Sequence, residues 1–178
     1  MTLLVKALTA GAELVPIAQN LSSEHRAALL RDATTTGDFV RGKDVFNRTS
    51  LVCSTCHVVN GKGGKLGPDL STVGSYMTPE SLLESLLNPN TDIKQGYETV
   101  ILTRRDGTVT AGLLQRMAEN ATLIRDTTGE VISVPASEIA SVDTSPVSLM
   151  PPGLTSSLRR DELVDLMTYL TSLGKSSD

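Results

Sequence analysis

Residues 53–57 read Cys53-Ser54-Thr55-Cys56-His57, and this stretch decides how the rest of the chain is interpreted. The 178-residue chain has only two cysteines and two histidines, and both cysteines and one histidine lie within these five positions. Thiolate and imidazole groups are the common protein ligands of zinc and of iron cofactors. We therefore expect the function of the chain to depend on this cluster.

Three chemistries use a Cys-x-x-Cys pair. A structural zinc site needs four ligands, but the only other histidine is His25 and there is no second cysteine pair. A thioredoxin-like redox pair follows a strand in a βαβ pattern, whereas this pair follows a predicted short helix and precedes a glycine-rich loop. Cys-x-x-Cys-His is the specific signature of c-type haem attachment, in which both thiols form thioethers and the histidine binds iron. The sequence favours one haem c per chain, held by Cys53, Cys56 and His57.

The composition argues against nucleic acid as a partner and against a membrane-spanning segment. The net charge is −4 and no run of five like charges occurs, so the basic surface of a nucleic-acid binder is missing. No apolar run approaches the roughly 18–20 residues that span a bilayer, and we expect no transmembrane segment. Aromatic residues make up only 3% of the chain, and a buried porphyrin would supply the flat apolar surface that they usually provide.

The beginning of the sequence bears on the location of the protein. Residues 1–20 contain no basic segment followed by an apolar stretch, the pattern of a signal peptide. Covalent haem attachment of this kind takes place on the outer side of the cytoplasmic membrane. We therefore expect an exported protein that acts in the periplasm or elsewhere outside that membrane. Because the signal-peptide pattern is missing, we expect the 178 residues to be part of a longer chain.

Helical patterns lie at both ends of the chain. Residues 1–36 are predicted to form a helical lead-in or a linker from a preceding domain, in which Ser22 can cap a short helix. A helix beginning at Pro79 is predicted because Thr78 is a good N-cap and proline suits the first helical position. Apolar residues at helical spacing predict a last helix over about 161–173.

Residues 97–143 show the residue pattern typical of β-strands instead of helical spacing. Five short apolar runs are separated by turns such as Asp106-Gly107 and Thr128-Gly129. Five strands in so few residues predict a small, strongly bent barrel that resembles Sm-like or SH3-like barrels in its strand spacing. We interpret it as a packing or docking module, because it has too few aromatic residues for a nucleic-acid reader.

The segments around the cluster resemble class I cytochrome c. They are Gly42 and Phe46, Gly67-Pro68-Asp69-Leu70, a Met150-Pro151 step, and a final helix with Tyr169. More closely, residues 38–174 resemble the haem-binding domain at the C-terminal end of large exported proteins of the planctomycete and verrucomicrobial groups. The resemblance implies a mainly α cytochrome c fold built from residues 37–96 and 144–175, with the small all-β barrel inserted at 97–143.

The resemblance also implies roles for single residues. His57 would be the proximal iron ligand, and the Pro68 carbonyl would accept the other ring N–H of that histidine. The candidates for the sixth ligand are Met77, Met117, Met150, Met167 and His25. Met150 is favoured because it lies in a proline-rich segment, expected to be extended, just before the last helix, where class I cytochromes place their methionine. Gly42, Phe46 and Tyr169 would allow the first and last helices to cross closely.

The expected function is electron transfer through a haem with His57 and Met150 as axial ligands. The chain shows no constellation of catalytic side chains, so we expect no enzymatic activity of its own. The resemblance implies a redox partner protein or a fused dehydrogenase domain as the electron donor. Two alternatives stay open: a haem enzyme or a gas or redox sensor with an open or labile sixth site, and an interaction module held by zinc or a disulfide without haem.

Overall fold

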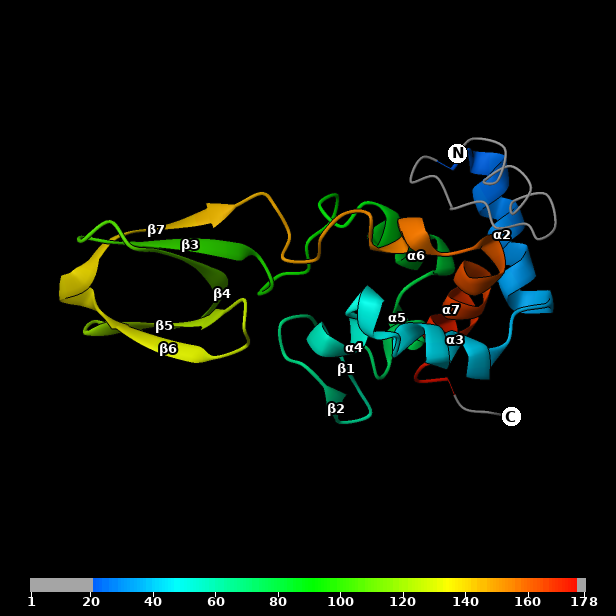
Figure 1. Cartoon of the computed structure of the whole chain (residues 1–178), viewed down its shortest axis with the longest axis horizontal. Helices are drawn as coiled ribbons and strands as arrows, with labels where there is room; N and C mark the ends of the chain where they lie inside the picture. Colours follow the sequence, from blue (N-terminus) through cyan, green and yellow to red (C-terminus); the bar gives the residue numbers. More distant parts are fainter. Residues whose placement is uncertain (1–20, 176–178) are drawn as a thin grey trace, which may run out of the picture. The chain divides into compact units, whose positions relative to one another are not determined.

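The computed structural model describes residues 21–175, which form two compact units (Figure 1). The helical unit consists of the chain up to Cys53, Leu70–Asn88 and the chain from Pro152 onward. The second unit consists of Ser54–Asp69 and Pro89–Pro151, and it contains the strands. Residues 1–20 of the predicted lead-in lie outside the described residues.

The helical unit is organised around its last helix. Its α-helices are α2 Ser23–Thr35, α3 Phe39–Phe46, α5 Val73–Tyr76, α6 Pro79–Leu87 and α7 Arg160–Ser172, with 3₁₀ turns η1 at Thr49–Leu51 and η3 at Leu154–Ser157. Helices α2, α3, α5 and α6 each pack on α7, whose apolar stripe is almost completely buried. The predicted start of α6 is confirmed, because the Ser81 N–H donates to the Thr78 side chain over 3.2 Å.

Helices α3 and α7 cross at Gly42. A Cβ atom added to Gly42 would overlap the backbone carbonyl of Asp165 and would lie 2.8 Å from the Cβ of Tyr169. The Tyr169 ring contacts Phe46, with the ring centroids 5.5 Å apart, and Phe39, with the centroids 5.1 Å apart. The predicted close helix crossing at Gly42, Phe46 and Tyr169 is therefore confirmed between α3 and α7.

A buried carboxylate reinforces this crossing. Asp165 on α7 is only 4% exposed, and it accepts hydrogen bonds from the Asp38 N–H at 2.7 Å and from the Arg41 guanidinium at 2.6 and 2.9 Å. The hydrogen bond to Asp165 raises the pKa of Arg41. A buried charge is tolerated when its oxygens are satisfied in this way. Asp165 thereby holds the first turn of α3 against α7.

The described part of the predicted lead-in is packed. Ser22 caps α2 as predicted, and Leu29 and Ala33 of this helix are buried. The Thr168 hydroxyl of α7 donates to the Ala33 carbonyl over 2.7 Å. Arg26 forms an ion pair with Glu84 of α6. Helix α2 is thus an integral layer of the helical unit.

The five predicted strands are confirmed and form one antiparallel sheet. They are β3 Thr99–Arg104, β4 Val109–Met117, β5 Ala121–Asp126, β6 Val131–Pro135 and β7 Ile139–Ser145, in the order β6-β5-β4-β3-β7, with the 3₁₀ turn η2 at Ala136–Glu138. A β-bulge between Leu114 and Arg116 bends β4, so that the sheet curves over its own core (Figure 1). That core contains Val100, Leu102, Ile124 and Val134. The likeness to an Sm-like or SH3-like barrel stays a prediction.

The close crossing of α3 and α7 predicts that even a methyl side chain at Gly42 strongly destabilises the protein. Gly42→Ala should lower the free energy of unfolding by about 3 kcal/mol, the upper end of the usual cost of overpacking, because the obstacle is backbone that cannot rotate away. Denaturant unfolding monitored by circular dichroism measures this. Val40→Ala, an exposed position of the same helix, is the control and should change the free energy little. Equal stabilities of the two variants would contradict the crossing.

The ion pair between α2 and α6 predicts a pH dependence. The hydrogen bonds from Arg26 and then from Asn88 lower the pKa of Glu84 below its ordinary value of 4.5. The stabilisation is therefore present above that ordinary value and is lost as the pH falls through the lowered pKa of the folded protein. Since the pair is partly exposed, Glu84→Gln should remove less than about 1 kcal/mol of this acid-sensitive stability.

Unfolding free energies measured at about pH 6 and about pH 3 would test this prediction. Their difference should be smaller in Glu84→Gln than in the unchanged protein. Glu80→Gln, on an exposed position of the same helix, should leave the difference as it is. An unchanged difference in Glu84→Gln would show that the ion pair contributes nothing to acid sensitivity.

Candidate functional site

The cysteine cluster folds as one helical turn. Helix α4 spans Cys53–Cys56, so the two cysteines are three residues apart on an α-helix and share one face. Val52 precedes the turn with a left-handed φ of 51° and redirects the chain from η1. Both side chains are half-buried thiols, and burial raises the pKa of Cys56. The turn presents two thiols side by side, as double attachment of one planar cofactor requires.

His57 follows this turn with its ring orientation fixed. Nδ1 lies 2.9 Å from the carbonyl oxygen of Pro68, which can only accept, so the Nδ1–H donates. The lone pair is then on Nε2, the atom left to bind a metal. Burial lowers the pKa of His57, while the hydrogen bond to Pro68 opposes that shift. The net effect favours the neutral imidazole, the form that coordinates iron.

The loop after His57 contains a short hairpin that the sequence did not predict. Strand β1, Val58–Val59, pairs with β2, Lys62–Gly63. Asn60 and Gly61 connect them with φ angles of 50° and 76°, the left-handed pair that a two-residue I′ turn requires. The predicted glycine-rich loop therefore contains a regular element at this point. The Asn-Gly dipeptide was the available signal for the hairpin.

The glycines of this loop cover the backbone of the cluster. The Gly64 N–H donates to the Ser54 carbonyl over 3.1 Å, and the Gly67 N–H donates to the Cys56 carbonyl over 2.8 Å. A Cβ atom on Gly64 would overlap the carbonyl of Thr55. A Cβ atom on Gly67 would lie 2.6 Å from Nδ1 and 2.9 Å from Nε2 of His57. These two glycines therefore support the cysteine turn and the imidazole, and the sequence carried no signal of these contacts.

The predicted sixth ligand lies in the segment that follows the sheet. Met150 is half-buried, and its N–H donates to the Ser148 hydroxyl over 3.1 Å. The prediction that this segment is extended was wrong, because it is bent and its N–H groups bond to side-chain oxygens. Cys53, Cys56, His57 and Pro68 form one local site, whereas ligation by Met150 stays a prediction.

The other candidates for the sixth ligand have separate environments. Met167 is fully buried on α7 within the core of the helical unit. Met117 is 60% exposed on β4. His25 is exposed, with Nδ1 2.9 Å from the hydroxyl of Ser22. Met77 is half-buried at the end of α5.

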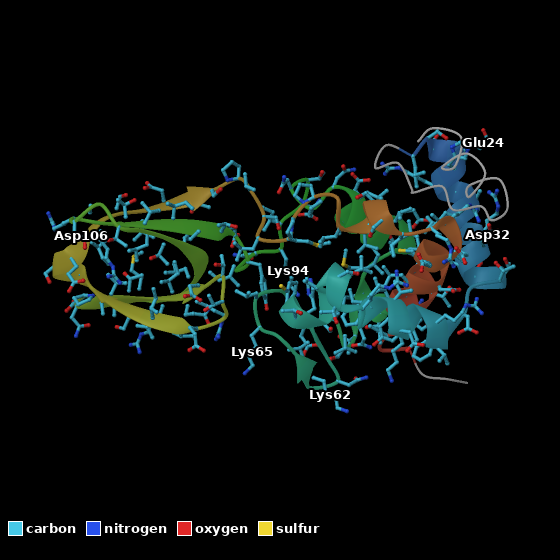
Figure 2. All side chains as sticks on the ribbon, in the orientation of Figure 1. Glu24, Asp32, Lys62, Lys65, Lys94 and Asp106 are labelled. Carbon is cyan, nitrogen blue, oxygen red and sulfur yellow. The ribbon has the colours of Figure 1, made fainter. Side chains whose placement is uncertain are left out.

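The surface of the loop carries positive charge. Lys62 and Lys65 are exposed, and Figure 2 shows both side chains directed away from the loop. Neither belongs to the hydrogen bonds that fix His57. These two positions therefore serve as controls for changes within the site.

Comparison with known proteins agrees with this geometry. Residues 39–107, less than half of the chain, match the family model described as Cytochrome c. The matched part contains α3, α4, His57, Pro68 and α6, and it ends at Gly107 in the turn after β3. The match supports a cytochrome c-like haem-binding domain, with its typical role in electron transfer, and implies covalently bound haem c with iron. No curated protein gave a significant match.

Between residues 21 and 175, no helix combines the length and the apolar character needed to cross a bilayer.

The contact between Gly67 and the imidazole makes a testable prediction. Gly67→Ala should force the His57 ring or the loop to move and cost about 1–3 kcal/mol of stability. In the haem-loaded protein, the visible spectrum should show a larger high-spin fraction, because Nε2 of His57, the predicted iron ligand, is displaced. Unfolding and absorption spectra measure the two effects. Lys65→Ala in the same loop should change neither, and a Gly67→Ala protein identical to it would refute the supporting role of Gly67.

Proposed function

We propose that this chain is a c-type cytochrome module that carries single electrons, with haem c bound at Cys53 and Cys56 and ligated by His57. The observation that carries the proposal is the α4 turn followed by a histidine whose Nδ1–H donates to the Pro68 carbonyl. The family match over residues 39–107 supports the same assignment.

The residues of the site fit this cofactor. Two thiols on one face of a helical turn suit two thioether bonds, and the adjacent imidazole keeps Nε2 for iron. Pro68 fixes the tautomer and the orientation of His57, and Gly67 supports the ring from the loop. When bound, haem c supplies a reversible one-electron change between ferric and ferrous iron. The chain supplies the orientation of the proximal ligand and the partial exclusion of water.

Met150 is the proposed sixth ligand. It is half-buried and is followed by Pro151 and Pro152 on the way to α7, and the core position of Met167 and the exposure of Met117 make them poorer candidates. A methionine ligand raises the reduction potential, and a haem with both axial positions filled favours electron transfer over substrate chemistry. We accordingly propose an electron carrier without catalytic residues of its own.

The wider context of the module is also proposed. Residues 37–96 and 144–175 would form the cytochrome domain, and 97–143 would form an inserted barrel of the Sm-like or SH3-like kind. The resemblance to the planctomycete and verrucomicrobial haem domains favours a redox partner or a fused dehydrogenase as the electron donor. Since haem attachment occurs outside the cytoplasmic membrane, the protein would act in the periplasm or beyond it.

A labile sixth ligand is the second candidate, and one observation favours it. The segment that carries Met150 has no helix or strand, and it turns at Gly153 with a left-handed φ of 87°. Such a segment can open locally at low cost. If Met150 leaves the iron readily, the module would act as a gas or redox sensor or as a haem enzyme.

Absorption spectra of Met150→Ala distinguish the two candidates. The unchanged haem-loaded protein should be low-spin and show the weak red band of methionine-to-iron ligation, and Met150→Ala should lose this band and bind carbon monoxide readily in the ferrous form. Met117→Ala, a change at an exposed methionine of β4, is the control and should keep the band. A high-spin unchanged protein would favour the sensor or enzyme, and a band that persists in Met150→Ala would assign the ligand to another residue.

A further inference from the structure

The chain enters and leaves the β-sheet through two irregular linkers, residues 89–98 and 146–153. The first and last strands are neighbours, and Thr99 of β3 pairs with Ser145 of β7. The first linker therefore ends, and the second begins, at neighbouring points of the ladder between β3 and β7. Met150 lies in the second linker, five residues after Ser145.

Side-chain oxygens satisfy successive backbone donors of the second linker. The Val147 N–H donates to the Ser145 hydroxyl over 3.1 Å, and the Met150 N–H donates to the Ser148 hydroxyl over 3.1 Å. Between these two, the Ser148 N–H donates over 2.8 Å to Oδ1 of Asn90, which lies 58 residues earlier in the chain. Asn90 thereby connects the first linker to the residue that binds the Met150 backbone.

These contacts have a mechanical consequence. A segment without helix or strand has no ladder to hold its backbone, so its conformation depends on the few hydrogen bonds that it makes. The bond from Met150 to Ser148 lies within the segment and moves with it, and the bond from Val147 reaches only Ser145 at the adjoining end of β7. The bond to Asn90 differs, because it attaches the segment to a distant part of the chain.

We infer that Asn90 is a positioning residue for Met150, acting through Ser148. The inference rests on the proposed role of Met150 as the sixth ligand. With the Asn90 contact intact, residues 147–150 keep one conformation and the methionine stays near the position set by the linker. Without it, the segment samples more conformations, and the methionine competes less well with an added ligand for the iron.

The expected size of the effect follows from the strength of one hydrogen bond. A hydrogen bond between partly exposed groups shifts an equilibrium by about three- to tenfold. The haem-loaded full chain with Asn90→Ala should therefore bind imidazole at the ferric iron about three- to tenfold more tightly than the unchanged protein. Asn90→Asp keeps an oxygen acceptor at the same position and should restore most of the difference. Thr91→Ala, at the next, exposed position, should match the unchanged protein.

Amide hydrogen exchange gives a second readout that does not use the iron. The Ser148 N–H should exchange faster in Asn90→Ala than in Thr91→Ala, while the amides of β3 and β7 should keep their protection. The conservative variant Asn90→Asp should show slow exchange at Ser148 again. This measurement tests the contact directly, whichever residue is the sixth ligand.

The outcomes separate the inference from the proposed function. If Met150→Ala keeps the methionine band, the proposed ligand is wrong, and the exchange of Ser148 still tests the contact. If Met150→Ala loses the band but Asn90→Ala binds imidazole no more tightly than Thr91→Ala, Asn90 does not position Met150 and the inference is overturned. Tighter imidazole binding in Asn90→Ala, together with rescue by Asn90→Asp, supports it.

Discussion

The close approach of α3 to α7 at Gly42 is the constraint on which the helical unit depends. The backbone of Asp165 occupies the space that any side chain at Gly42 would need, and the Tyr169 ring fills the volume beside it. The Asp165 carboxylate then holds the first turn of α3. Since only six residues separate Phe46 from Cys53, the end of α3 also determines where α4, the helical turn that carries both thiols, begins.

The site itself depends on short-range contacts. Hydrogen bonds from the glycine loop return to the carbonyls of Ser54 and Cys56, and the Pro68 carbonyl receives the ring N–H of His57. Each of these bonds joins residues fewer than 15 positions apart. A site of this kind is preorganised by its own segment, so the His57 imidazole is oriented by neighbouring residues of the same loop.

This locality explains what the sequence could predict. Helix α6 and the five strands could be predicted because caps, periodicity and Asp-Gly or Thr-Gly turns are local signals, and the hydrogen bond from His57 to Pro68 was expected from the resemblance. The packing of α2 on α7 was missed because nothing in the sequence around Leu29 and Ala33 indicates which helix these residues pack against. The bent Met150 segment was also missed, since its shape depends on Asn90, 58 residues earlier. Contacts between distant residues leave no periodic trace in one sequence.

The two ends of the five-stranded sheet lie close together because of its topology. Because β3 and β7 pair at Thr99 and Ser145, the two ends of a sheet of nearly fifty residues emerge side by side. The connection from α6 to α7 therefore enters and leaves the sheet at neighbouring points, as a short loop would. The same topology affects the segment that follows the last strand. Met150 follows the ladder by five residues, so its position depends both on the strand pairing and on the linkers that leave it.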